Sequence, residues 1–208
     1  RQINQIKYIN KSKLINPYIS NKENFLSYNK SRPKGLDSTV CYAPSRSIFF
    51  DMNGNALACC FNRAFVLGKY PNENLKQIIN GDRRKFLQKE LSKQNFLYGC
   101  QHCLKQIESG NYFGTEARLY DTLPDKSFLP TEIIFELDNT CNLECIMCNG
   151  YFSSKINDNS DKQKNSNPYD ENFVNELKEF IPHLKIAKFL GGEPFLINIY
   201  YKIWDIIL

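Results

Sequence analysis

The sequence of 208 residues contains no run of eighteen apolar residues, so we expect no segment of it to span a membrane. Its beginning also lacks the apolar stretch of a secretory leader. Eight cysteines without such a leader argue against a disulfide-stapled secreted protein and favour a reducing, cytoplasmic setting. A chain with 42% apolar residues can build packed cores without covalent staples.

Positive charge is concentrated at the start of the chain. The formal net charge is +5, but residues 1–40 alone carry eight Lys and Arg against two acidic residues, which leaves the remainder close to neutral. A basic head of this kind could bind phosphate groups, although we favour a simply solvated segment. Basic and aromatic residues are not regularly interleaved, so we expect no nucleic-acid partner.

Three cysteines within eight residues, Cys141, Cys145 and Cys148, are the most informative feature. Three thiolates on one tight loop can hold three corners of a cubic iron–sulfur cluster and leave its fourth iron open to a small molecule. Zinc is the main alternative, but it usually needs four protein ligands, and no cysteine or histidine follows Cys148 until His183. We give His183 no role. Disulfides are disfavoured because cysteines this close together make poor partners.

A glycine turn, Gly191-Gly192-Glu193-Pro194, directly follows a second strand-like run. Together with the CxxxCxxC loop it resembles the radical S-adenosylmethionine (radical SAM) enzymes, over roughly residues 130–208. The resemblance implies that the three cysteines ligate a 4Fe–4S cluster whose open iron chelates S-adenosylmethionine. It also implies that Gly191, Gly192 and Glu193, with Pro194, form the turn that receives the cofactor's ammonium group. Met147 stands where the family often has an aromatic residue beside the adenine.

Four earlier cysteines, Cys41, Cys59, Cys100 and Cys103, make a plausible closed tetrad. Asn53-Gly54 lies between two apolar runs and predicts a tight hairpin, which brings the first two cysteines toward the same end. The last two lie on one turn, as in both iron–sulfur and zinc sites, so the metal stays open at this point. His102 could be a further ligand, but a solvent-facing histidine is the simpler interpretation.

The spacing of this region also resembles a known unit. A cysteine, a glycine, a second cysteine and a later CxxC pair are similar to the SPASM/twitch auxiliary-cluster domain of radical SAM enzymes. The resemblance implies that the tetrad holds an auxiliary 4Fe–4S cluster and leaves Cys60 as a packed neighbour or a substitute ligand. In most of the family this unit follows the catalytic barrel, whereas here it precedes it.

The composition predicts four segments along the chain. A basic, Asn/Lys-rich extension covers 1–36, a small α+β auxiliary domain with a β-hairpin covers 37–116, and a connector covers 117–130. The auxiliary domain should contain helices over 74–80 and 82–91, separated at Gly81. Residues 131–208 are expected to be the first two βα units of a partial (βα)6 radical SAM barrel, an α/β fold.

In this last part we predict strands over 131–137 and 184–190. A helix capped by Asn167, with Pro168 at its first position and ended by Pro182, should lie between them, and a final apolar helix should begin near residue 197. Residues 153–168 are almost without apolar side chains and predict a mobile loop, either a lid or a spacer. Because the final helix has no stop signal, we expect the sequence to be truncated within the barrel.

The two resemblances imply a radical SAM oxidoreductase. Such an enzyme reductively cleaves S-adenosylmethionine to a 5′-deoxyadenosyl radical that abstracts hydrogen from a substrate. Expected partners are S-adenosylmethionine, an electron donor such as flavodoxin or ferredoxin, and a substrate. Modification of a peptide or protein is favoured over that of a small molecule or other natural-product precursor. The alternatives are a cysteine-rich zinc scaffold without turnover and an electron carrier that does not cleave the cofactor.

Overall fold

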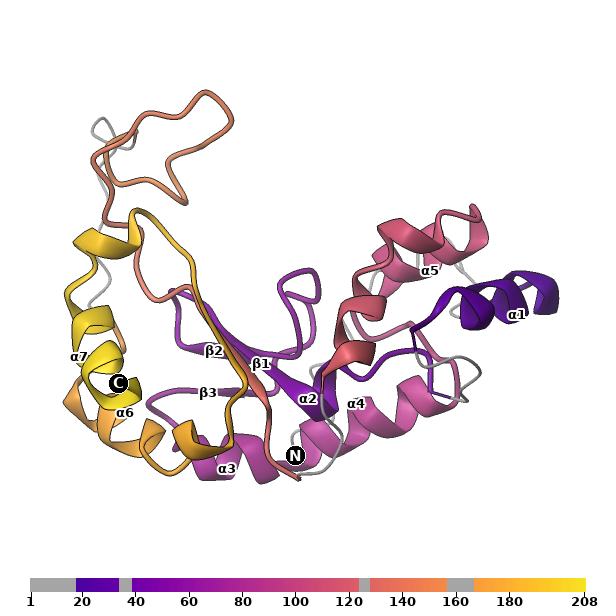
Figure 1. Ribbon diagram of the computed structural model, residues 1–208, viewed down its shortest axis with the longest axis horizontal. Coiled ribbons are helices and arrows are strands. Elements are labelled where there is room, and N and C mark those ends of the chain that lie inside the picture. Colours follow the sequence, from indigo (N-terminus) through magenta and orange to yellow (C-terminus); the bar gives the residue numbers. More distant parts are fainter. Residues whose placement is uncertain (1–17, 34–38, 124–127, 157–166) are drawn as a thin grey trace.

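The computed structural model describes residues 18–33, 39–123, 128–156 and 167–208 (Figure 1). In this part of the chain, the strands form one five-stranded sheet in the order β3-β2-β1-β4-β5. The prediction of an α/β fold is therefore confirmed, whereas the barrel stays a prediction. The strands are β1 (Ser47–Phe50), β2 (Asn55–Leu57), β3 (Gly68–Lys69), β4 (Glu132–Phe135) and β5 (Ile186–Phe189).

The sheet joins two segments that the sequence suggested as separate domains. Strands β1, β2 and β3 pair antiparallel, and Phe49 lies opposite Leu57. On its other side β1 pairs parallel with β4, where Ile48 lies opposite Ile133. Strand β5 then pairs parallel with β4, as expected for two βα units. The carboxyl ends of β1, β4 and β5 therefore meet at one edge of the sheet.

The predicted hairpin turn has the backbone that Asn53-Gly54 requires. Gly54 has a φ of +81°, and a Cβ there would lie 2.2 Å from the carbonyl oxygen of Tyr70. One carboxylate oxygen of the buried Asp51 accepts hydrogen bonds from the backbone N–H groups of Asn53 and Asn55, each at 2.9 Å. The turn is thus fixed by local hydrogen bonds and by the close approach of another segment.

One face of the sheet is covered by three helices, α3 (Leu75–Asn80), α6 (Glu171–Leu177) and α7 (Asn198–Ile207). Helix α3 begins with a capping box, in which Asn74 and Gln77 exchange side-chain to backbone hydrogen bonds. Alternate strand residues point into this layer. The larger buried side chains of this core are Ile48, Phe50, Ile133, Phe135, Phe173, Leu177, Tyr200 and Ile203.

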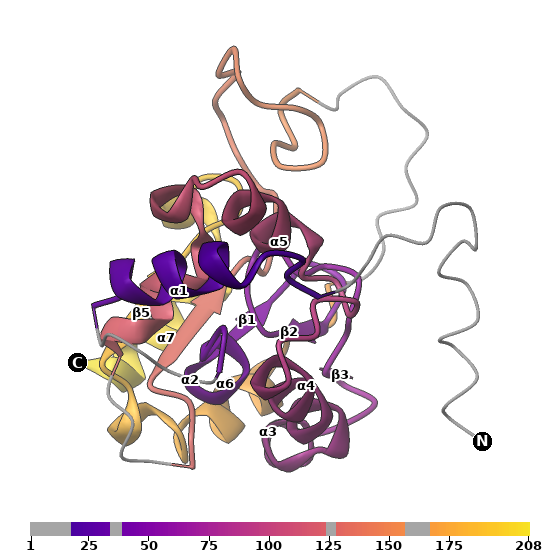
Figure 2. The same ribbon diagram turned by 90° about the vertical axis from the view of Figure 1, so that its right-hand side faces the viewer.

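A second hydrophobic core lies in the arm of the molecule that is drawn at the right of Figure 1. It is built from α1 (Lys22–Ser31), α2 (Ala43–Arg46), α4 (Asp82–Ser92) and α5 (Gln101–Glu108), and α1 lies against α5 (Figure 2). A buried ion pair between Arg32 and Asp121, at 2.7 Å, joins the start of this arm to its end. The short 3-10 helices are η2 (Tyr112–Gly114), η3 (Glu116–Thr122), η4 (Ile181–His183) and η5 (Pro194–Leu196).

Two predicted helix boundaries were wrong. Helix α6 begins at Glu171, and its N-cap is Asp170, whose side chain accepts from the backbone N–H of Phe173 at 3.0 Å. The Asn167 side chain instead donates to the carbonyl oxygen of Leu137. This contact ties the segment before α6 to the residues that follow β4. The helix also ends at Leu177, and Pro182 falls in η4.

Several predictions fall partly outside the described residues. These are most of the extension over 1–36, residues 124–127 of the connector, and residues 157–166 of the predicted mobile loop. Of the extension, Lys22–Ser31 form α1. Among the described residues, no helix combines the length and apolar character needed to cross a membrane.

Candidate metal centres

The four cysteines of the predicted tetrad line one pocket. Cys41 precedes α2, Cys59 follows β2, and Cys100 and Cys103 lie at the start of α5. The pocket is partly open to solvent. Its remaining wall is mostly apolar and includes Ala58, Leu87, Leu91, Phe96, Ala117 and Tyr120. Four thiols from three separate segments therefore line the same pocket.

Every sulfur of the tetrad faces an N–H donor. The backbone N–H of Ala43 lies 3.3 Å from the Cys41 sulfur, and Asn62 Nδ2 lies 3.4 Å from the Cys100 sulfur. Such donors stabilise thiolates and tune the potential of a cluster that thiolates hold. The backbone donors to the other two sulfurs are Phe61 and Asn62 for Cys59, and Glu116 and Ala117 for Cys103.

Asn62 is a site residue that sequence reasoning missed. Its side chain is buried, with 1% exposed, and Nδ2 also donates to the carbonyl oxygen of Tyr98 at 2.8 Å. The close fit needs Gly99, where a Cβ would lie 1.9 Å from Asn62 Oδ1. The only signal in the sequence is the position of this asparagine three residues after Cys59.

Burial keeps the tetrad thiols protonated when no metal is bound. Desolvation raises the pKa of Cys59 to about 12 and that of Cys103 to about 11, and it raises the pKa of Cys41 well above its ordinary value. Metal ligation requires the thiolate, so a bound cation would have to supply the compensating charge. The chemistry of the pocket fits a positively charged metal centre.

This burial predicts an alkaline instability of the metal-free chain. The folded state holds the protons of Cys59 and Cys103 at pH values where the unfolded chain has lost them. Stability is therefore complete below pH of about 8.5 and falls as the pH rises from there toward about 11, by up to about 1.4 kcal/mol per pH unit and thiol. Urea unfolding at about pH 8 and about pH 10, one value below and the other above the ordinary pKa of a thiol, measures the loss.

The matched control compares two cysteine variants. Cys59→Ala should reduce the difference between the two pH values, because it removes one buried thiol. Cys145→Ala should leave the difference unchanged, because that cysteine is exposed. Equal losses in both variants would contradict the assignment of the effect to the pocket.

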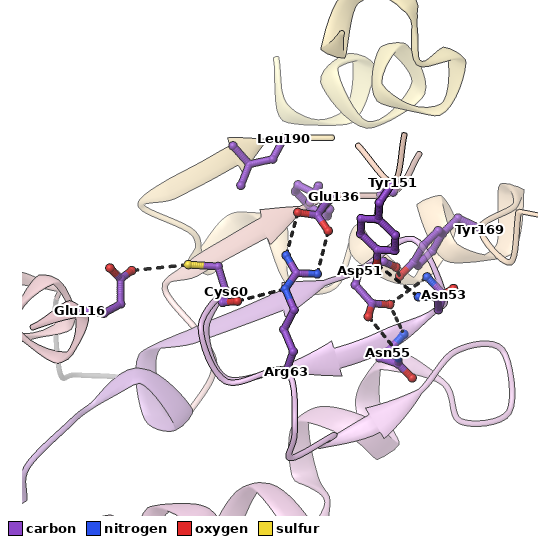
Figure 3. A network of polar contacts seen from close by, with 12 residues as sticks. Asp51, Asn53, Asn55, Cys60, Arg63, Glu116, Glu136, Tyr151, Tyr169 and Leu190 are labelled. Atoms are coloured by element: carbon purple, nitrogen blue, oxygen red, sulfur yellow. Dashed lines mark hydrogen bonds and ion pairs between the residues drawn. The ribbon is translucent and has the colours of Figure 1, made fainter. Parts of the chain in front are cut away.

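Cys60 and His102 lie beside the tetrad. Cys60 packs against Phe49, Leu57 and Ile134 of the sheet, and its thiol donates to Glu116 Oε1 at 3.8 Å (Figure 3). This places it as a packed neighbour of the pocket. The exposed ring of His102 stacks on Phe61, with ring centroids 4.5 Å apart, and contributes to the pocket wall.

The loop with the other three cysteines follows β4 and stands away from the body of the molecule (Figure 1, Figure 2). Its base is closed by Ser154, whose Oγ accepts from the backbone N–H of Cys141 at 3.0 Å and whose own N–H donates to the Asn139 carbonyl at 2.8 Å. The backbone N–H of Cys148 donates to the Cys145 carbonyl at 2.8 Å. Met147, at the tip, has 84% of its side chain exposed.

The glycine turn is hydrogen-bonded to the base of this loop. The backbone N–H of Gly192 donates to the Asp138 carbonyl at 3.1 Å, and that of Glu193 donates to the Thr140 carbonyl at 2.9 Å. A Cβ on Gly192 would lie 2.2 Å from the Thr140 oxygen, so only glycine allows this approach. The Glu193 carboxylate accepts from the N–H of Phe195 at 3.3 Å and caps η5, which begins at Pro194. The structure thus brings the two motifs together.

The thiols of the two sites are not gathered around single points. Within the described ranges, no group of three or more His, Cys, Asp or Glu side chains is placed to hold one metal ion. The tetrad sulfurs instead surround a pocket, and those of Cys141, Cys145 and Cys148 lie on an exposed loop.

Tyr200 positions both motifs. Its buried hydroxyl accepts from the backbone N–H of Leu137 at 3.0 Å and lies 2.7 Å from the carbonyl oxygen of Leu190. Leu137 precedes the cysteine loop, and Leu190 precedes the glycine turn. One hydroxyl from α7 therefore sets the spacing between the ends of β4 and β5.

We expect Tyr200→Phe to lower the free energy of unfolding by about 2 kcal/mol, because it leaves the buried N–H of Leu137 without its acceptor. Urea denaturation of the purified chain measures the change. Tyr201→Phe is the control: its hydroxyl donates to the Phe195 carbonyl at the surface and should contribute less than about 0.5 kcal/mol. Similar losses in both variants would mean that the Tyr200 hydroxyl has no special role.

Comparison with known families bears on the tetrad. Residues 41–104 match the SPASM iron-sulfur cluster-binding domain. The match begins at Cys41 and extends one residue beyond Cys103, so it takes in the whole tetrad. The predicted resemblance of this region to the SPASM unit is confirmed, and the match supports binding of an iron–sulfur cluster. Comparisons with curated proteins and with solved structures found no match.

Proposed function

We propose that the chain is the part of a radical SAM oxidoreductase that holds two 4Fe–4S clusters. The SPASM tetrad (Cys41, Cys59, Cys100 and Cys103) would hold the auxiliary cluster, and the loop of Cys141, Cys145 and Cys148 would hold the cluster that binds S-adenosylmethionine. The observation that carries the second part is the pair of backbone hydrogen bonds between the glycine turn and the cysteine loop. They place both motifs at the carboxyl ends of adjacent parallel strands, where α/β proteins bind ligands.

A 4Fe–4S cluster held by Cys141, Cys145 and Cys148 would supply the electron for reductive cleavage of S-adenosylmethionine, the chemistry by which radical SAM enzymes abstract hydrogen from a substrate. The residues of the chain bind and orient. Gly191 and Gly192 let the turn approach the base of the cysteine loop, where a Cβ would meet the carbonyl oxygens of Asp138 and Thr140. The turn would receive the ammonium group of the cofactor, with the Glu193 carboxylate as the opposite charge, and the exposed Met147 could pack on the adenine ring.

The auxiliary site supports transfer of one electron from the substrate. Four cysteines leave no iron of a 4Fe–4S cluster without a protein ligand, so the cluster is suited to electron transfer more than to binding a substrate. Sulfurs that surround a pocket, each with an N–H donor, fit a cluster of several atoms. The proposal includes flavodoxin or ferredoxin as the external electron donor and a peptide, protein or other natural-product precursor as the substrate.

The test uses the full-length protein prepared without oxygen. We expect about eight irons per chain and formation of 5′-deoxyadenosine when dithionite and S-adenosylmethionine are added. Cys148→Ser should remove about four irons and abolish 5′-deoxyadenosine, whereas Cys103→Ser should remove about four irons from the other site. A colourless protein loaded with zinc would favour a scaffold, and iron without 5′-deoxyadenosine would favour an electron carrier.

A further inference from the structure

The face of the sheet opposite α3, α6 and α7 carries charged side chains that the two cluster sites do not use. We call it the inner face, made of Ser47, Phe49, Glu132, Ile134, Glu136 and Lys188, which alternate with the residues of the helix-covered core. Arg63 forms a bidentate ion pair with Glu136, at 2.9 Å for each bond (Figure 3). Lys188 Nζ lies 2.6 Å from Glu132 Oε1.

Two buried polar atoms of the inner face lack a hydrogen-bond partner within the described part of the chain. They are Glu132 Oε2 and Ser47 Oγ, on residues with 2% and 0% of their surface exposed. Ser47 lies directly opposite Glu132 in the register of β1 and β4. Burying a polar oxygen without a hydrogen-bond partner is costly, so two such atoms on residues that are paired across the strands point to a place for a donor group.

A third acceptor comes from outside the sheet. Glu116, at the start of η3, interacts electrostatically with both Glu132 and Lys188. One of its carboxylate oxygens accepts from the Cys60 thiol (Figure 3). The three carboxylates of Glu116, Glu132 and Glu136 are thus accompanied by two cations, those of Arg63 and Lys188. The inner face has one negative charge in excess.

We infer that Glu132, Ser47 and Glu116 bind a primary ammonium group of the substrate. An ammonium group is compact, carries one positive charge and offers three donors, which matches three acceptors and one excess negative charge. A guanidinium fits less well, because Lys188 already occupies the second oxygen of Glu132.

The position of this site relates it to both cysteine centres. Glu116 also lines the pocket of the tetrad. Lys188 lies on β5, which ends just before the glycine turn. Ser47 and Glu132 are the first residues of β1 and β4, so a substrate held there by its ammonium group would lie beside the tetrad pocket and would have to extend along the inner face to reach the cysteine loop at the carboxyl end of β4. Its identification as the substrate rests on the proposed function, whereas the binding of an ammonium group does not.

Binding can be tested with two blocked tripeptides, N-acetyl-Gly-Lys-Gly-amide and the same peptide with norleucine, which has a similar side chain without the charge. Calorimetric titration of the chain at low salt should show the lysine peptide binding about tenfold more tightly, as one charge-assisted hydrogen bond provides. Glu132→Gln should reduce the affinity for the lysine peptide to that for the norleucine peptide, and Ser47→Ala should weaken the affinity for the lysine peptide about threefold. The control is Glu179→Gln, which removes an exposed carboxylate paired with Lys76 and should change nothing.

Equal binding of the two peptides, or undiminished binding by Glu132→Gln, would overturn the inference. So would a structure in which a buried water satisfies both atoms while the lysine peptide has no effect. If Glu132→Gln does not fold, Ser47→Ala and an arginine peptide carry the test, and arginine binding as tightly as lysine contradicts an ammonium site. A lysine preference without formation of 5′-deoxyadenosine would refute the proposed function alone, and 5′-deoxyadenosine without that preference would refute this inference alone.

Discussion

Gly192→Ala should abolish the site of the cysteine loop while leaving the auxiliary site intact. The added Cβ would lie 2.2 Å from the Thr140 oxygen and 2.6 Å from the Asn139 carbonyl group, both of them backbone atoms that cannot rotate away. The base of the loop must therefore move, and the two hydrogen bonds that join it to the glycine turn are lost. We expect about four of eight irons to disappear and 5′-deoxyadenosine formation to fall by about a hundredfold or more.

Gly110→Ala is the matched control. Gly110 has a φ of +75°, so alanine there pays a conformational penalty of about 1 kcal/mol, yet no atom lies within 4 Å of the new Cβ. This variant should keep its irons and its activity. Iron analysis and 5′-deoxyadenosine assays on both variants distinguish the effect of the steric clash in Gly192→Ala from the effect of backbone strain alone in Gly110→Ala. Full iron content in Gly192→Ala would show that the contact between the motifs does not matter for cluster binding.

Arg84→Met should be the most destabilising single change in the arm that carries the tetrad. Arg84 is 1% exposed, and its guanidinium donates to the carbonyl oxygens of Pro44, Ser45 and Ile79 at 2.7 to 2.9 Å. Methionine fills the space but leaves these buried acceptors unpaired. The loss of stability is partly offset, because the substitution also removes a buried positive charge. The cost of burying that charge shows in the pKa of Arg84, which burial lowers to about 10. The net cost is about 3 kcal/mol.

The effect should reach the metal site, because Pro44 and Ser45 belong to α2, which begins two residues after Cys41. Chemical denaturation measures the loss of stability, and iron analysis measures retention of the auxiliary cluster. Lys85→Met is the control, since Lys85 lies next in the chain, is half exposed and forms only a 3.8 Å ion pair with Asp82. Equal stability of the two variants would show that the buried guanidinium has no structural role.

Local signals made much of the fold predictable. Asn53-Gly54 fixed the hairpin, because only certain residues adopt the backbone of that turn. Helices were expected over 74–80 and 82–91 with a break at Gly81, and α3 and α4 lie there, separated at Gly81. At Asn167 the same logic failed. Its side chain bonds to the end of β4, a contact that no local pattern reveals.

The candidate sites divide in the same way. Cysteine spacing indicated both sets of thiols, since ligands of one centre recur at short intervals. The donors and positioning groups around them came from elsewhere in the chain, as the Asn62 amide on Cys100 and the Tyr200 hydroxyl on Leu137 show. Likewise, pairing of β1 with β4 depends on strands that are far apart in the sequence. Sequence patterns report ligands well and tertiary neighbours poorly.

The parallel pairing of β1 with β4 limits how this protein can be recombined. A strand from the SPASM match occupies one edge of β4, while β5 occupies the other. Grafting a SPASM unit from another protein in place of residues 41–104 would therefore also replace one side of the strand that leads to Cys141. A functional chimera would have to preserve the strand register at that seam, so the two halves are expected to evolve as a matched pair.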